Sequence, residues 1–206
     1  GAAVTLAIGP KEGRLSDTAT ELIVLYREIG AQPEEVHREL ARFRLQGTNE
    51  AAYYKIRDEF PFPEGINLAK RAARLIYLNR VGFNGLYRTN KEGKFNVPHG
   101  KKAKKKGASV GENLTPSWPT LADMMTVARA LEHVHVAAQP WLEALKGCAP
   151  GDTIYADPPY FGTYDGYGPK WAKADHEALA EALRQLWCWG VNVIVSRYTR
   201  LAVTGS

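Results

Sequence analysis

The pattern that most constrains the fold is a strand, a helix and a second strand in succession near the C-terminal end of the chain. Two short candidate strands, residues 154–157 and 191–195, flank a segment with helical periodicity. The apolar positions of that segment are Ala178, Leu179, Ala182, Leu183, Leu186 and Trp187. We expect Asp175 to cap this helix and Gly190 to end it. Because such a unit normally places its two strands in parallel, the pattern predicts an α/β fold.

The first of these strands runs directly into the tetrapeptide Asp157-Pro158-Pro159-Tyr160. At average residue usage, such a tetrapeptide arises by chance in a chain of this length about once in a thousand. The Asp157 carboxylate and the Pro158 carbonyl, restricted by the proline that follows, can accept hydrogen bonds from a planar amine and offset the charge that develops during its methylation. Tyr160 offers an aromatic face to a base swung out of its duplex. The alternative is an ordinary proline turn after a strand.

A second motif occupies residues 83–100, with the sequence Phe-Asn-Gly-Leu-Tyr-Arg-Thr-Asn-Lys-Glu-Gly-Lys-Phe-Asn-Val-Pro-His-Gly. It resembles the signature of the D12 class of DNA adenine-N6 methyltransferases, in which Phe-Asn-Gly-Leu-x-Arg-x-Asn-x-x-Gly-x-Phe-Asn-Val-Pro-Phe-Gly precedes the catalytic tetrapeptide. The two motifs occur in the family's order, and the resemblance covers most of the chain. His99 departs from the signature, which has an aromatic residue there, so the resemblance leaves the recognition sequence open.

The resemblance implies S-adenosylmethionine as cofactor and Asp157, Pro158, Pro159 and Tyr160 as catalytic residues, with Asp157 also near the cofactor. Asp17 matches the acidic residue that receives the ribose hydroxyls in the family. From the sequence alone, a helix N-cap is an equally good explanation of Asp17. Gly1 and Ala2 resemble the tail of the family's glycine-rich cofactor loop. The resemblance therefore implies an N-terminally incomplete family member that lacks the preceding strand.

A basic segment follows and overlaps the second motif. Between residues 88 and 106, eight Lys or Arg residues stand against Glu92 alone and give a net charge of +7, whereas the whole chain carries +5, so the remainder is net −2. Such an island is typical of phosphate contacts, although a solvated lysine run or a localisation signal is the better explanation of the lysines at 101–106 taken singly. The predicted nucleic-acid-binding residues are Asn84, Tyr87, Arg88, Asn90, Lys94, Asn96, Lys101 and Lys102.

The same segment is expected to read bases from a hairpin. Aromatic residues at Phe83, Tyr87 and Phe95 alternate with amides and a guanidinium, which are groups that wedge into a base stack or bind base edges. Gly93 is the expected hairpin tip. In the family this segment belongs to a target-recognition hairpin.

Residues 31–140 lack the alternation of strands and helices found near the C-terminal end. Helices are expected at residues 34–45, 51–60, 68–79 and 121–130. The resemblance implies a Rossmann-like S-adenosylmethionine-dependent methyltransferase core, formed by residues 1–30 and 141–206. Residues 31–140 would be a mainly helical target-recognition insert that carries the β-hairpin.

Other features narrow the class of protein. No run approaches the roughly 18 apolar residues of a membrane span, and no secretory leader is recognisable, so we expect a cytoplasmic protein of prokaryotic or phage-like type that acts at the nucleoid. The two cysteines and five histidines have no metal-ligand spacing, and we predict no metal. No obligate protein partner is inferred.

Together these features predict an adenine-specific DNA methyltransferase. It would transfer a methyl group from S-adenosylmethionine to N6 of a flipped-out adenine in duplex DNA, without a covalent enzyme intermediate. Two alternatives remain open at this point. The acceptor could be RNA adenine or another planar amine, because the tetrapeptide specifies the nitrogen and not its polymer, or the chain could be a catalytically incompetent DNA-binding module. Host maintenance, restriction–modification and mobile-element roles are equally compatible with the sequence.

Overall fold

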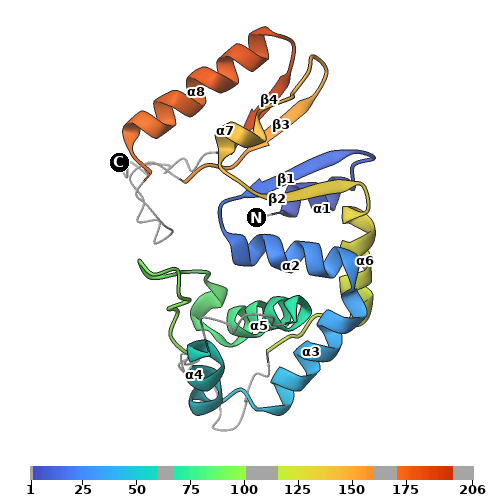
Figure 1. The fold of residues 1–206 in the computed structure, drawn as a ribbon, viewed down its shortest axis with the longest axis vertical. Helices are drawn as coiled ribbons and strands as arrows, with labels where there is room; N and C mark the ends of the chain where they lie inside the picture. Colours follow the sequence, from blue (N-terminus) through green and yellow to red (C-terminus); the bar gives the residue numbers. More distant parts are fainter. Residues whose placement is uncertain (1, 60–66, 101–115, 160–170, 197–206) are drawn as a thin grey trace, which may run out of the picture. The chain divides into compact units, whose positions relative to one another are not determined.

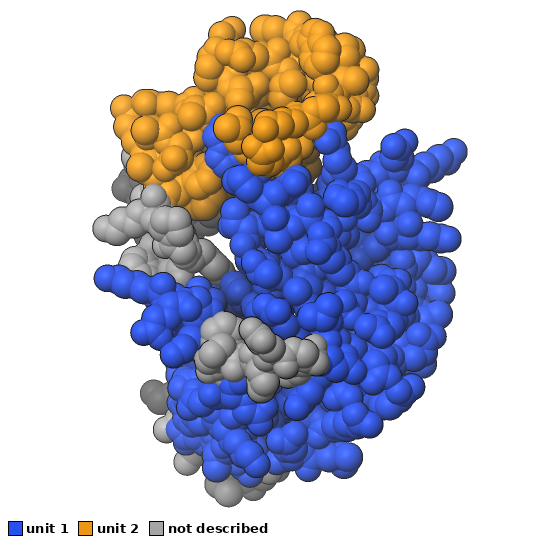
Figure 2. Space-filling model, in the orientation of Figure 1, with its two compact units in different colours: residues 1–141 blue, residues 142–206 orange. Residues whose placement is uncertain are grey.

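A computed structural model of the chain describes residues 2–59, 67–100, 116–159 and 171–196 (Figure 1). The chain divides into two compact units, residues 1–141 and 142–206, which are coloured separately in Figure 2. The first unit contains α1 (Ala3–Ile8), β1 (Gly13–Asp17), α2 (Thr20–Ala31), α3 (Pro33–Leu45), α4 (Glu50–Asp58), α5 (Leu68–Val81), the 3-10 turn η1 (Phe83–Gly85), α6 (Leu121–Leu131) and β2 (Val134–Ala138). The remaining elements are α7 (Trp141–Ala144), β3 (Thr153–Ala156), α8 (Lys173–Cys188) and β4 (Asn192–Val195).

The first unit combines a parallel strand pair with a group of helices. β1 and β2 run in parallel from the pair Gly13 and Val134 to the pair Asp17 and Ala138. Helix α2 packs against this sheet and also against α5 and α6, so it joins the sheet to the helical layer (Figure 1). β2 lies within residues 31–140, where the sequence analysis predicted helices and a hairpin only. The division into a catalytic core and a target-recognition insert remains a prediction.

Two apolar clusters stabilise this unit. A small cluster centred on Ile23, Leu131 and Val136 joins α2 and α6 to the sheet. The larger cluster lies among α2, α3, α4, α5 and α6, and it includes Phe95 and Val97 from the segment that follows α5. Because apolar burial is the main stabilising term in folding, this segment is anchored to the helices by its own side chains.

Buried polar groups of α5 bind backbone carbonyls of the neighbouring α4 and of the loop before it. The Arg74 guanidinium is buried, and it donates to the carbonyls of Ile56, at 2.8 Å, and Arg57, in the last turn of α4. A cation suits the negative end of the helix dipole there, although burial lowers the pKa of Arg74 from its ordinary value. The Tyr77 hydroxyl donates to the Gly47 carbonyl at 2.7 Å, and burial raises its pKa to about 12. α4 is thereby fixed against α5.

The second unit contains the strand–helix–strand pattern predicted from the sequence. β3 and β4 are parallel, with Thr153 opposite Asn192 and Ala156 opposite Val195. Of the predicted apolar face of α8, Leu179 and Leu183 are buried, whereas Trp187 is 65% exposed. The prediction of parallel strands flanking a helix is confirmed, and the chain is of mixed α/β class.

The predicted helices agree with the structure within a few residues, but Asp175 is not the N-cap of α8, and the alternative interpretation of Asp17 as an N-cap is excluded. α8 begins at Lys173, so Asp175 lies inside its first turn and accepts the Ala172 N–H at 2.7 Å. α2 begins at Thr20 with Ala19 at the N-cap, so Asp17 is not the cap. Within the described ranges, no helix has the length and apolar character needed to cross a membrane.

Candidate functional site

Asp157 lies where β3 ends. Its chain continues through Pro158 and Pro159, so the aspartate is the first residue beyond the carboxyl end of the strand. Asp157 is exposed, while the two prolines are half-buried. In open parallel sheets, ligands bind at this end of the strands. The carboxylate therefore stands at an edge where it can meet a substrate.

Ser196, which the sequence analysis did not assign to the site, lies beside Asp157. It follows β4, and its hydroxyl donates a hydrogen bond to Oδ1 of Asp157. The predicted parallel pairing could have revealed this contact, because residues that follow two neighbouring parallel strands end at the same edge. The contact joins the ends of β3 and β4.

Asp17 occupies the equivalent position in the first unit, at the carboxyl end of β1. It is the last residue of the strand, and its Oδ1 accepts the Ala19 N–H at 2.8 Å. The Asp17 carbonyl accepts the N–H of Gln139, which follows β2, and the Gln139 side chain donates to Ser16 Oγ at 3.0 Å. A half-buried carboxylate is thus fixed at the strand edge, where it is suited to accept hydroxyl hydrogen bonds.

The predicted recognition segment, residues 83–100, reverses direction as expected, but its two arms meet only at isolated bridges and form no strands of a β-hairpin. Thr89 and Phe95 form an antiparallel bridge, and Gly93 has a φ of 77°, which glycine adopts without strain. Asn90 shapes the turn, because its Oδ1 accepts the backbone N–H groups of Glu92 and Lys94 at 3.0 and 2.9 Å. Much of the hydrogen-bonding capacity predicted for base contacts therefore stabilises the turn itself.

Arg88 and Asn96 bind each other across the reversal. Arg88 Nε donates to Asn96 Oδ1 at 2.8 Å, and its Nη2 donates to the Asn96 carbonyl at 3.3 Å. The Asn96 N–H in turn donates to the Arg88 carbonyl at 2.9 Å. In this structure the pair fixes the spacing of the two arms, and the other Arg88 nitrogen can still extend toward a ligand.

Hydrogen bonds hold the two ends of the segment against α4 and the C-terminal end of α5. Tyr53 is fully buried and donates its hydroxyl to the Val97 carbonyl at 2.9 Å. Burial raises the Tyr53 pKa well above its ordinary value, so the phenol stays protonated and remains a donor. Gly82 pairs with His99 in an antiparallel bridge, and His99 Nε2 lies 2.9 Å from the Thr48 carbonyl. His99 therefore helps to hold this end of the segment against the loop before α4.

The side chains of this segment differ in how exposed they are to solvent. Phe95 is only 8% exposed and packs in the core, so its predicted role as a wedge was wrong. Phe83 is 44% exposed, and Asn84, beside it, has a left-handed backbone with a φ of 53°. Such strain at a non-glycine residue often accompanies a functional site. The Lys94 ammonium pairs with Glu92 at 2.8 Å.

Some predicted site residues cannot be placed. Tyr160, Lys101, Lys102 and Gly1 lie outside the described residues. Ala2 is buried, and its N–H lies 3.3 Å from the Tyr26 hydroxyl. Among the residues that are described, no group of three or more His, Cys, Asp or Glu side chains could hold a metal ion.

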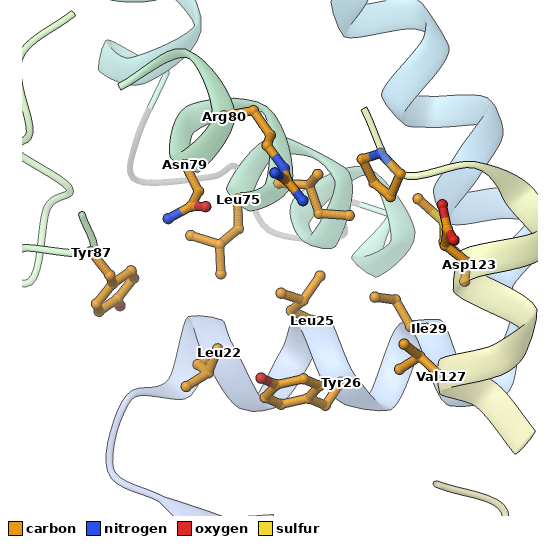
Figure 3. Close-up of a pocket in the computed structure, with 13 residues that line it drawn as sticks. Leu22, Leu25, Tyr26, Ile29, Leu75, Asn79, Arg80, Tyr87, Asp123 and Val127 are labelled. Carbon is orange, nitrogen blue, oxygen red and sulfur yellow. The ribbon is translucent and has the colours of Figure 1, made fainter. Parts of the chain in front are cut away.

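A hollow of about 310 Å³ lies between α2, α5 and α6 (Figure 3). Its lining is mainly apolar, and Tyr87 and Asp123 lie at opposite ends of it. Tyr87 is the one predicted site residue in this lining, and it also packs edge-on against Phe95 with ring centroids 5.9 Å apart. Asp17 is not among the residues that line the hollow.

Comparison with known proteins identifies the family. The model of the D12 class N6 adenine-specific DNA methyltransferases matches residues 1–202. The retron Ec67 DNA adenine methylase of Escherichia coli is 33% identical over 196 residues, covering 94% of this chain and 64% of that protein. The type II methyltransferase M1.LlaDCHI of Lactococcus lactis subsp. cremoris is 27% identical over 95% of this chain and 68% of its own length. The DNA adenine methylase of Salmonella typhi is 29% identical over 71% of this chain and 48% of its own length. The chain thus spans about half to two thirds of these relatives.

Proposed function

The chain belongs to the D12 class of N6 adenine-specific DNA methyltransferases, and from that membership we propose that its protein transfers a methyl group from S-adenosylmethionine to N6 of adenine in duplex DNA. The observation that carries the proposal is the position of Asp157, which leads into two prolines at the carboxyl end of β3. Relatives named DNA adenine methylase support the same substrate. A cytoplasmic location agrees with this activity and remains a prediction.

The chemistry of the strand end suits an amine. The N6 lone pair of adenine is delocalised into the ring, so its attack is favoured by acceptors that bind the amine hydrogens and offset the developing positive charge. We assign these acceptors to the Asp157 carboxylate and the Pro158 carbonyl. Since a stacked base hides N6, the adenine must leave the duplex, and we assign Tyr160 to stack on it. The reaction is a direct displacement.

The cofactor assignment rests on Asp17, at the carboxyl end of β1. When bound, S-adenosylmethionine supplies an electrophilic methyl group. Asp17 is the acceptor that we propose for its ribose hydroxyls, because the carboxylate is fixed at the carboxyl end of β1. The resemblance to the family implies a Rossmann-like core for the catalytic part. We propose that arrangement for the whole protein, with residues 31–140 carrying DNA recognition.

The test is transfer of labelled methyl from S-adenosylmethionine to unmethylated duplex DNA by the full-length protein, with the modified nucleoside identified. We expect N6-methyladenine in DNA, and no label in duplexes whose adenines are already N6-methylated. Label in structured RNA but not in DNA would instead establish the alternative acceptor. Binding to DNA, without binding of S-adenosylmethionine and without transfer, would establish a non-catalytic module.

The lysine run gives a separate prediction about DNA binding. Changing Lys101, Lys102, Lys104, Lys105 and Lys106 to alanine should weaken binding and flatten its dependence on salt. Each lost phosphate contact removes about 0.9 from the magnitude of the slope of log affinity against log salt concentration, so that magnitude should fall by as much as about 4.5. The measurement is a binding titration at several salt concentrations.

Two other lysines provide the control for this series. Lys146 and Lys173 are exposed, and each pairs with a glutamate one helical turn away. Their replacement by alanine should leave the slope unchanged. An unchanged slope in the five-lysine variant would show that the run is merely solvated.

A further inference from the structure

The hydrogen-bond ladder between β3 and β4 continues one residue past the end of β4. β4 ends at Val195, yet the Ser196 N–H donates to the Ala156 carbonyl at 2.9 Å. This extra rung fixes the Ser196 backbone directly beside Asp157, although the two residues are 39 positions apart in sequence. Ser196 is half-buried, whereas Asp157 is exposed. The serine therefore belongs to the rigid part of the strand edge, and the aspartate faces outward from it.

The hydrogen bond from Ser196 limits the orientations that the Asp157 carboxylate can adopt. The final torsion of an aspartate has a broad, roughly two-fold distribution, so an exposed Asp157 would sample many carboxylate orientations. The Ser196 hydroxyl donates to Oδ1, and a hydrogen bond to an ionised acceptor is stronger than one between neutral groups. Because the Ser196 backbone is held by the ladder, only one side-chain torsion separates the donor from a fixed frame. The contact selects one orientation of the carboxylate.

We propose that Ser196 is a positioning residue for methyl transfer, which orients the Asp157 carboxylate toward the substrate amine. The proposal rests on the function proposed above. An ionised carboxylate has about four lone-pair sites, so it can accept the bond from Ser196 together with bonds from the amine. Catalytic groups need to be held within about 0.5 Å of the productive geometry by neighbouring hydrogen bonds. Ser196 meets that need with a donor that is itself fixed by the sheet.

The test separates orientation from stability. In the full-length protein, Ser196→Ala should lower the single-turnover rate of methyl transfer about 10-fold to 100-fold, the range that loss of a hydrogen bond to a charged group corresponds to. The KM for S-adenosylmethionine and the Kd for DNA should remain within about two-fold of wild type, because Ser196 contacts neither ligand in this proposal. Ser196→Thr keeps the hydroxyl and should restore most of the rate.

A second variant controls for loss of a hydrogen bond on the same strand. Asn192 lies at the opposite end of β4, and its amide donates to the Asp152 carbonyl at 3.4 Å. Asn192→Ala should leave the single-turnover rate unchanged. The proposal is overturned if Ser196→Ala transfers methyl at the wild-type rate, or if Ser196→Thr is as slow as Ser196→Ala although both remain folded by circular dichroism. Failure of the proposed function itself is a different result, namely no methyl transfer by the wild-type protein.

Discussion

Asp157→Ala is expected to abolish methyl transfer, with a loss of at least about 10³-fold in kcat, while DNA binding is retained. The variant removes the carboxylate that we assign to the amine, and loss of a single charge-stabilising group in an active site already costs about 10²-fold to 10³-fold. Asp157 is exposed and lies beyond the end of β3, so its side chain contributes little to the core. The measurement is single-turnover transfer of labelled methyl, with the DNA affinity determined on the same preparation.

Asp152 provides a matched control on the same strand. It precedes β3 at the opposite end, is exposed, and its carboxylate accepts the Ala149 N–H at 2.8 Å. Asp152→Ala removes the same chemical group and should cost only some stability in the preceding turn, with kcat unchanged. Equal loss of DNA binding and methyl transfer in Asp157→Ala would contradict the catalytic role. So would equal losses of kcat in the two variants.

The parts of the site that the sequence predicted are those fixed by local pattern. Periodicity along residues 173–188 and the two short candidate strands on either side of it sufficed for β3, α8 and β4, because each feature depends on neighbours in sequence. The position of Asp157 at a strand end follows from the same pattern. β2 was missed because it is only five residues long, and its alternation of apolar and polar residues covers Val134, His135 and Val136 before two alanines, which are depleted in strands.

Side-chain contacts give the recognition segment its shape. The partners in these contacts cannot be predicted from the pattern of residues along the sequence. Phe95 is aromatic and lies between polar residues, yet it packs in the core because the reversal turns it toward the helices. Arg88 and Asn96 have the same side-chain groups whether they bind a base or each other. The composition of the segment was therefore enough to identify it. Which of its side chains face outward and which hold the segment together could be assigned only from the three-dimensional structure.

That arrangement depends on close backbone contact at Gly82, and we expect Gly82→Ala to destabilise the first unit by about 3 kcal/mol. A Cβ at this position would lie 2.5 Å from the Leu78 carbonyl oxygen and 2.9 Å from the Tyr53 hydroxyl. The backbone of Gly82 has a φ of −72°, which alanine adopts freely, so the cost is steric. Neither neighbour can move easily, because Leu78 is in a buried helix and the Tyr53 hydroxyl holds the Val97 carbonyl.

Relief of this clash requires the recognition segment to move away from α5, with loss of the Gly82–His99 bridge and of the hydrogen bond from the Phe83 N–H to the Pro98 carbonyl. Gly82→Ala should therefore weaken DNA binding as well as lower the midpoint of chemical denaturation. Gly30→Ala is the matched control, because a Cβ there meets only Leu131 Cβ, at 3.8 Å, and alanine favours a helix by up to about 1 kcal/mol over glycine. If Gly82→Ala unfolds at the wild-type midpoint and binds DNA normally, the segment does not depend on this contact for its position.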